Sequence, residues 1–200
     1  MPRDLYVTGI PAADRLLRSD GTALLIGMLL DQQVPMEWAF TGPYTLRQRL
    51  GHLDAARIAR MDPEKFVALC AEKPAIHRFP ASMARRIHAL CVILADEYKG
   101  RGANVWHKVD DAAELKKRLR TLPGFGEEKA QIFIALLAKR FGIRPQGWEK
   151  AAGPFSDHRM RTVADITSQE ALLKVRAFKK REKARDRDKA GKPLRAKTRT

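Results

Sequence analysis

The chain has 200 residues, of which 44% are hydrophobic, which is enough for one domain with a buried core and a possible tail. Its formal net charge is +16 and its pI is near 10.3. A field of that sign attracts polyanions, so nucleic acid or an anionic membrane is the expected partner. The longest apolar run, residues 23–30, is far shorter than the roughly 20 residues that cross a bilayer, which excludes a membrane-spanning protein.

The positive charge is unevenly distributed. Residues 171–200 carry thirteen Lys or Arg against three acids, a net of +10, which leaves +6 for the rest of the chain. Many unrelated proteins have basic tails, so this segment indicates polyanion binding without deciding the function.

The two cysteines, Cys70 and Cys91, lie on apolar stretches and are typical of small buried side chains in a reducing cytosol. There is no CxxC pair and no Cys/His cluster, so the sequence predicts neither a zinc nor an iron–sulfur site and no other cofactor. The first residues, MPRDLYVTGI, lack the apolar core of a signal peptide. We therefore expect a cytoplasmic protein, associated with the nucleoid if the source is bacterial.

Helical periodicity dominates the first half of the chain. Residues 5–8 are the one short β-like stretch, and residues 11–18 predict a short helix. Residues 21–33 are apolar on nearly every face, which marks a central and fully packed helix. The elements expected next are a helix opened by Pro35 and amphipathic pieces over residues 44–50, 54–60, 63–70 and 80–98.

The second half is also predicted to be helical. Residues 110–122 form a helix with Asp110 or Asp111 as its N-cap, a break follows at 123–126, and a helix resumes over 127–141. Residues 142–155 are expected to be an irregular connection. A capping-box pattern, Thr167 with Glu170, predicts the start of a final helix.

Apolar residues stop beyond about Lys180, so residues 180–200 are expected to be a disordered basic tail. The predicted fold class is all-α, with residues 1–179 as a single helical unit.

Residues 122–130, LPGFGEEKA, stand between two predicted helices. Gly124 allows a turn closed to other residues, and Gly126 lets the backbone approach a partner. The following helix opens with free N–H groups and the positive end of its dipole, which together attract one phosphate without reading a base. The alternative is a plain connector in which Pro and Gly only end a helix.

This segment resembles the hairpin of the helix-hairpin-helix (HhH-GPD) DNA glycosylase superfamily, which includes endonuclease III and the adenine–mismatch and alkyladenine glycosylases. Residues 24–34, LLIGMLLDQQV, resemble that family's first core helix, which ends in a glutamine next to the DNA. Residues 79–94, FPASMARRIHALCVIL, resemble its middle helix. The resemblance covers roughly residues 20–165 and implies an HhH-GPD-like fold that lacks the family's cluster cysteines.

The resemblance also implies which chemistry to expect. Lysine-bearing members place a nucleophilic lysine two residues beyond the second glycine, and here that position is Glu128. Lys129 follows one residue later, rotated by about 100° around the helix. Strand-cleaving lyase activity is therefore not expected, and a monofunctional glycosylase is. Glu128 is a candidate acid or base in place of the lysine, although a glutamate in a helix's first turn needs no such role.

The family's second catalytic group is an aspartate on a loop that follows the hairpin. Asp165, in RTVADIT, resembles that context, whereas Asp157, in PFSDHR, is nearer to the expected spacing. We favour Asp165. A carboxylate there would stabilise the oxocarbenium-like sugar or orient the attacking water. Either acid has the alternative of a helix cap or a salt bridge.

The resemblance predicts DNA contacts from Gly124, Phe125, Gly126 and Lys129. It also predicts that Gln33 enters the duplex in place of an extruded base. Gln32 and Gln33 have the alternative of merely ending a buried helix. Trp38 and Tyr44 are candidates to stack on the extruded base, although aromatic residues at this spacing are more often core.

Together these features predict a monomeric, monofunctional DNA glycosylase that excises a damaged or mismatched base from double-stranded DNA. One alternative is a non-catalytic protein of the same fold that recognises lesions or DNA shape. Another is RNA binding through the basic tail.

Overall fold

The computed structural model describes residues 5–185, 187–191 and 193. These residues form helices joined by turns, and they contain no strand. The predicted all-α class is confirmed. The β-like stretch at residues 5–8 is not paired into a sheet, and it packs Leu5 and Val7 into the core instead.

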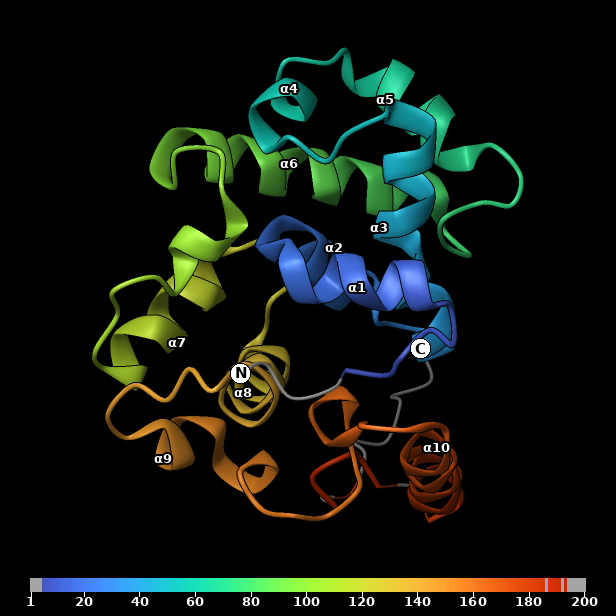
Figure 1. Ribbon diagram of the computed structural model, residues 1–200. Coiled ribbons are helices and arrows are strands. Elements are labelled where there is room, and N and C mark those ends of the chain that lie inside the picture. The colour runs from blue at the N-terminus through green and yellow to red at the C-terminus, as the bar shows by residue number, and fades with distance from the viewer. Residues whose placement is uncertain (1–4, 186, 192, 194–200) are drawn as a thin grey trace, which may run out of the picture.

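The first half of the chain surrounds one buried helix. The helices are α1 (Pro11–Ser19), α2 (Gly21–Leu30), α3 (Met36–Leu50), α4 (Ala55–Ala59), α5 (Pro63–Ala71) and α6 (Pro80–Glu97). Every residue of α2 from Thr22 to Leu30 is buried, as its all-round apolar sequence predicts. Helix α2 packs on α3 and α6, and α4 and α5 cover the far side of α6 (Figure 1). Helix α3 runs through Pro43 without a break, where two separate pieces were expected.

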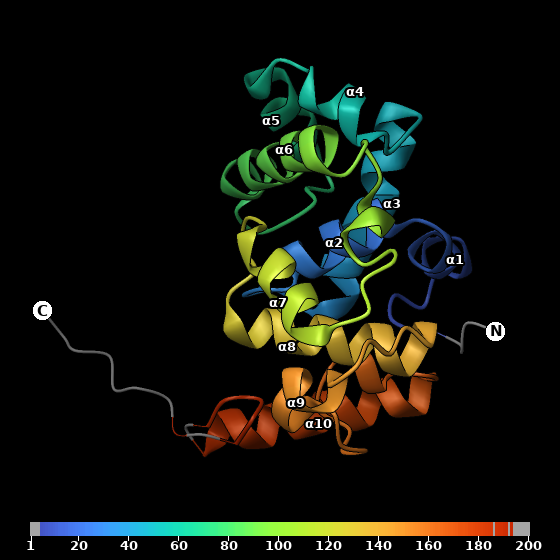
Figure 2. The same ribbon diagram turned by 90° about the vertical axis from the view of Figure 1, so that its left-hand side faces the viewer.

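The second half forms a layer on the other side of α2 (Figures 1 and 2). It contains α7 (Ala112–Thr121), α8 (Glu127–Leu136), which continues into a π turn (Leu137–Phe141), then α9 (Trp148–Ala152) and α10 (Gln169–Ala184). The Asp111 carboxylate caps α7 by accepting from the Ala113 N–H at 2.8 Å, as predicted. Helix α8 packs between α7 and α9.

The predicted capping box of Thr167 and Glu170 is wrong. Ser168 caps α10 by accepting from the Ala171 N–H at 3.2 Å. A capping box does occur a few residues earlier, where Thr162 and Asp165 close a 3₁₀ turn (Val163–Asp165). A capping box is therefore present in this segment, but five residues before the predicted one. Several Ser, Thr and Asp residues here can serve as caps, and the sequence does not show which of them does.

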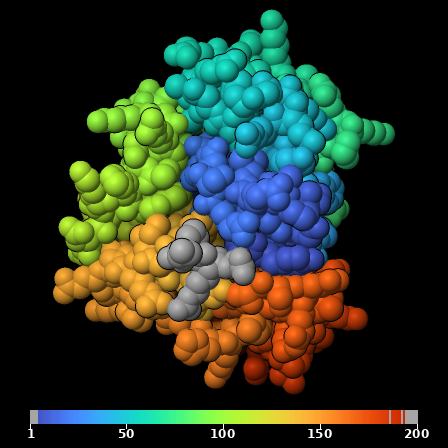
Figure 3. Space-filling model, in the orientation of Figure 1, coloured from blue at the N-terminus to red at the C-terminus, as the bar shows by residue number. Residues whose placement is uncertain are grey.

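Helix α10 continues to Ala184, beyond the point where the apolar pattern stops. Residues 186, 192 and 194–200 of the predicted tail lie outside the described residues. Figure 3 shows the two halves in contact over one face, with the N-terminal helices between the α4–α6 region and the α8–α10 region.

The core is one continuous cluster that runs from Leu5 to Val175. Cys70 and Cys91 lie within it, and burial raises the pKa of each thiol to about 12. Across the described ranges, no helix combines the length and the apolar composition needed to span a bilayer. No three His, Cys, Asp or Glu side chains in this part of the chain gather closely enough to hold a metal ion.

Two glycines fix the N-terminal end of α2 against the 3₁₀ turn Gly102–Val105. The Gly102 N–H donates to the Thr22 hydroxyl at 3.1 Å. A Cβ on Gly102 would lie 2.5 Å from the Thr22 nitrogen, and one on Gly21 would lie 2.4 Å from the Ala103 nitrogen. The two backbones therefore touch directly, and this contact sets the direction of α2.

We predict that Gly102→Ala lowers the free energy of unfolding by about 1–3 kcal/mol, because the new methyl group forces the two backbones apart. Gly126→Ala is the control, since a Cβ there meets no atom within 4 Å. It should change stability by less than about 0.5 kcal/mol. Urea unfolding of both variants measures the difference, and equal stabilities would contradict a tight contact at Gly102.

Candidate nucleic-acid interface

The hairpin between α7 and α8 exposes its two glycines. The turn closes through the Phe125 N–H, which donates to the Leu122 carbonyl at 3.1 Å. Gly124 has a φ of +79°, in the left-handed region that favours glycine. Gly124 and Gly126 are both exposed, and the space around Gly126 is open. The backbone is therefore accessible where a phosphate would approach.

The first turn of α8 is free of a side-chain cap, because its N-cap residue is Gly126. Its N–H groups therefore stay available to an anion. Two acids of this turn would oppose an anion, but both have basic partners. Glu127 pairs with Lys116 and with Arg120, the latter at 3.5 Å, and Glu128 pairs with Lys189 at 3.7 Å.

The Phe125 side chain is buried rather than exposed. Its ring meets Phe133 edge to face at 5.7 Å, and Phe133 in turn lies 5.5 Å from Trp106. Phe125 therefore anchors the hairpin in the core. Of the four predicted hairpin contacts, this one is available only through its backbone.

Lys129 connects the hairpin to the end of α2. Its Nζ donates to the Leu29 carbonyl at 3.0 Å. Burial lowers the pKa of Lys129 to about 8, and the nearby Asp31 carboxylate opposes that shift. Lys179 of α10 has the same surroundings, with its pKa lowered to about 8 by burial and raised in part by Asp31.

Sequence reasoning missed Asp31 and Lys179. Asp31 had a signal, because an acid at the C-terminal end of an apolar helix opposes the helix dipole. Lys179 had none, since it is one of many lysines in a basic segment.

The two glutamines in the loop after α2 differ in their contacts and in their exposure. Gln32 is held by two contacts. Its side-chain amide donates to the Leu29 carbonyl at 3.1 Å, and its backbone carbonyl lies 2.9 Å from His77 Nε2. Gln33 is exposed and has a φ of +57°. A non-glycine residue in this region is uncommon and is found more often at functional sites.

An aromatic patch of Trp38, His77 and Phe79 lies next to this loop. Trp38 is 40% exposed and Phe79 is 43% exposed, and their rings lie 6.4 and 6.1 Å from that of His77. Sequence reasoning did not single out Phe79. Tyr44 is half-buried and lines a different surface, together with residues of α1, so the structure does not bring it to the loop.

Asp165 is 7% exposed, and both of its carboxylate oxygens are occupied. One accepts from Lys139 Nζ at 2.7 Å, and the other accepts from the Thr162 N–H at 3.0 Å. Asp157 accepts from the Arg161 guanidinium. Lys139 follows Lys129 by ten residues, about 15 Å along the helix axis, so these two acids are not brought to the hairpin.

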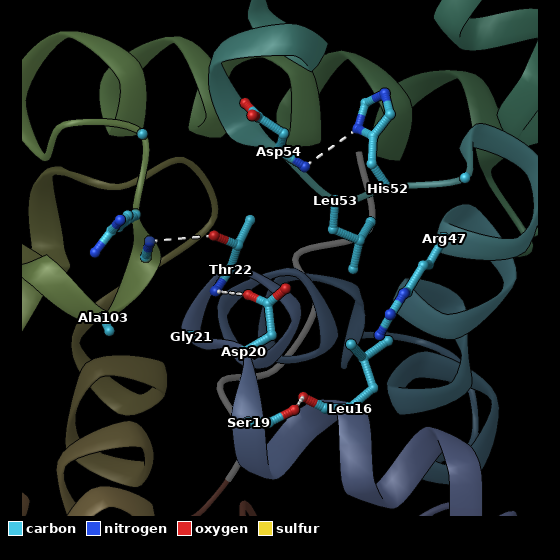
Figure 4. A pocket seen from close by; sticks show the side chains of 14 residues that line it. Leu16, Ser19, Asp20, Gly21, Thr22, Arg47, His52, Leu53, Asp54 and Ala103 are labelled. Atoms are coloured by element: carbon cyan, nitrogen blue, oxygen red, sulfur yellow. Dashed lines mark hydrogen bonds between the residues drawn. The ribbon is translucent and has the colours of Figure 1, made fainter.

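A surface pocket lies at the opposite, N-terminal end of α2 (Figure 4). Its polar groups are engaged locally: Asp20 accepts from the Thr22 N–H at 2.8 Å, and His52 Nδ1 accepts from the Asp54 N–H at 3.2 Å. Burial, and then the charge of Arg57, lower the pKa of His52. These are caps and turns, and the pocket contains no residue of the hairpin.

The Lys129–Leu29 hydrogen bond thus brings the hairpin to the end of α2, and His77 connects the loop after α2 to the aromatic patch. A family model described as HhH-GPD superfamily base excision DNA repair protein matches residues 26–195. No match was found among curated proteins. The family match spans the end of α2, the hairpin and α10, and the chain therefore belongs to the HhH-GPD superfamily of base excision DNA repair proteins.

Proposed function

We propose that this protein is a monofunctional DNA glycosylase, which hydrolyses the N-glycosidic bond of a damaged or mismatched base in duplex DNA. One observation carries the proposal. The Lys129–Leu29 hydrogen bond places a bare, uncapped hairpin beside an exposed glutamine loop. The hairpin suits backbone contact without base reading, and the loop suits entry into the duplex.

In this proposal the hairpin around Gly124 and Gly126 binds one phosphate and fixes the register of the duplex. Gln33 fills the gap left by the extruded nucleotide. Trp38 lies beside the loop and Tyr44 does not, so stacking on the extruded base is assigned to Trp38. Phe79 adds a second exposed ring to the same surface.

Water is the proposed nucleophile. Glu128 occupies the position of the nucleophilic lysine and is paired with Lys189. The resemblance assigns assistance in bond cleavage to Asp165 or Asp157, with Glu128 as a further acid–base candidate. The contacts of Asp165 and Asp157 favour a structural role, and substitution decides between the two roles.

A non-catalytic lesion-binding protein is the second candidate. The observation that favours it is the position of Asp165 and Asp157, both engaged by basic groups away from the hairpin. We further propose that the protein acts as a monomer in the cytoplasm, and that residues 180–200 add non-specific phosphate contacts.

An excision assay tests the function directly. Purified protein is incubated with end-labelled duplexes that carry a single uracil, hypoxanthine, alkylated, oxidised or mismatched base, and half of each sample is treated with alkali. We expect strand cleavage of one duplex only after alkali. Cleavage without alkali would identify a lyase, and tight binding without any cleavage would identify the non-catalytic protein.

Gly126→Ala should weaken duplex binding about tenfold while the fold is retained, because the methyl group occupies space that a phosphate needs. Deletion of residues 194–200 is the comparison. It removes three basic residues and should lower the slope of log Kd against log salt by up to about three. If the deletion abolished binding and Gly126→Ala had no effect, binding through the tail would replace the hairpin.

Asp165→Asn should lower the free energy of unfolding by about 3 kcal/mol, because it leaves the buried Lys139 ammonium without its anionic partner. Asp157→Asn should cost less, about 1–2 kcal/mol, because the Asp157 side chain is partly exposed although that of Arg161 is buried. Excision is then measured at a temperature where both variants are folded. If neither substitution reduces excision, the assignment of these two carboxylates is wrong.

A further inference from the structure

Asp31 is the C-cap residue of α2, two residues after the Leu29 carbonyl that accepts from Lys129 of α8. It is 8% exposed, and its backbone N–H donates to the Gly27 and Met28 carbonyls. Within the described residues, its carboxylate has no direct hydrogen bond or ion pair. Asp165, buried to the same extent, has partners for both oxygens. Asp31 is therefore a buried carboxylate whose hydrogen-bonding capacity is left open.

The position of Asp31 is unfavourable for the fold taken alone. It stands at the C-terminal end of α2, where the helix dipole repels an anion. Burial removes part of the hydration of its carboxylate, and no protein group among the described residues donates a hydrogen bond in return. Residues that break a local rule of stability without a structural gain occur chiefly at functional sites.

Two amines offset the charge of Asp31 at longer range. Lys129 is held nearby by its hydrogen bond to Leu29, two residues before Asp31. Lys179 lies on α10. This helix contacts α3 through an ion pair in which Arg176 Nη1 lies 3.0 Å from Glu37 Oε1. Among the neighbouring charges, Asp31 contributes most to opposing the lowered pKa of both lysines, so its negative charge acts on both amines.

The substrate would reach this carboxylate. Asp31 and Gln33 are two residues apart, so their Cα atoms are separated by at most about 7 Å. In the proposed function Gln33 fills the place of the extruded nucleotide. The sugar of that nucleotide therefore leaves the duplex next to Asp31.

We propose that Asp31 is the catalytic carboxylate of this glycosylase, an assignment that rests on the proposed function. The C1′–N bond breaks and its electron pair goes to the base nitrogen, while Asp31 stabilises the positive charge on the sugar. The oxygen of water then bonds to C1′. The proton that this water loses passes to Asp31 and then to the departed base. The products are the free base and an abasic sugar with a hydroxyl at C1′, and Lys129 and Lys179 act as positioning residues.

The test uses three duplexes, which carry a pyrrolidine nucleotide, a tetrahydrofuran nucleotide or no modification. The pyrrolidine is a cation that mimics the charged sugar, and the tetrahydrofuran is its neutral counterpart. Wild-type protein should bind the pyrrolidine duplex at least about tenfold more tightly than the tetrahydrofuran duplex. Asp31→Asn should abolish this preference. Asp110→Asn, at an exposed position, should retain it.

A second variant keeps the test decisive if Asp31→Asn does not fold. Lys179→Gln removes a cation that competes for Asp31, so it should strengthen the preference for pyrrolidine. No preference in the wild-type protein, a preference that survives Asp31→Asn, or one weakened by Lys179→Gln would overturn the proposal.

The excision assay separates this inference from the proposed function. If no base is excised but the pyrrolidine preference depends on Asp31, the carboxylate site stands and the enzymatic function fails. If a base is excised and no preference is found, the function stands and Asp31 is excluded. Where excision occurs, Asp31→Asn should slow it at least about 100-fold. The same substitution should leave binding to unmodified duplex unchanged or stronger, because it removes a negative charge.

Discussion

The hydrogen bond from Lys129 Nζ to the Leu29 carbonyl joins the two halves of the molecule at the point where function is expected. Carbonyls in the last turn of a helix lack intrahelical partners, so the Leu29 carbonyl accepts from Lys129 as well as from the Gln32 amide. By using this acceptor, the first turn of α8 sets the hairpin and the Gln33 loop at a fixed separation. Both surfaces can contact DNA only if they match the spacing of a duplex, and the Lys129 side chain helps to set that spacing.

The Lys129–Leu29 hydrogen bond has an electrostatic cost, because it buries a charged amine. It draws a lysine amine out of water, and α10 brings a second amine to the same place. Asp31 is the negative charge that makes this arrangement tolerable, although its own position at a helix C-terminus is poor. The three groups are interdependent, and the charge balance leaves the carboxylate without a direct partner. A fold optimised for stability alone would have apolar residues here.

Much of the fold was predictable, because the relevant signals are local. The all-round apolar sequence of α2, the periodicity of α6 and the Gly124–Gly126 hairpin each depend on neighbours within a few residues. The capping box was misplaced, because Thr162 and Thr167 both stand three residues before an acid and only tertiary packing selects between them. The burial of Phe125 and of Lys179 depends on packing between distant segments, so no local sequence pattern predicts it.

Helix α2 is fixed at both ends, by backbone contact with the 3₁₀ turn at Gly102 and by Lys129 at Leu29. In the proposed function, a helix held at both ends would resist deformation when it meets the duplex. The work of deformation therefore falls on the DNA, where it varies with stacking and pairing strength. Base pairs weakened by damage or mismatch bend and open at lower cost than intact ones. In the proposed function, the rigidity of this buried helix would favour weakened base pairs before any pocket contacts the base.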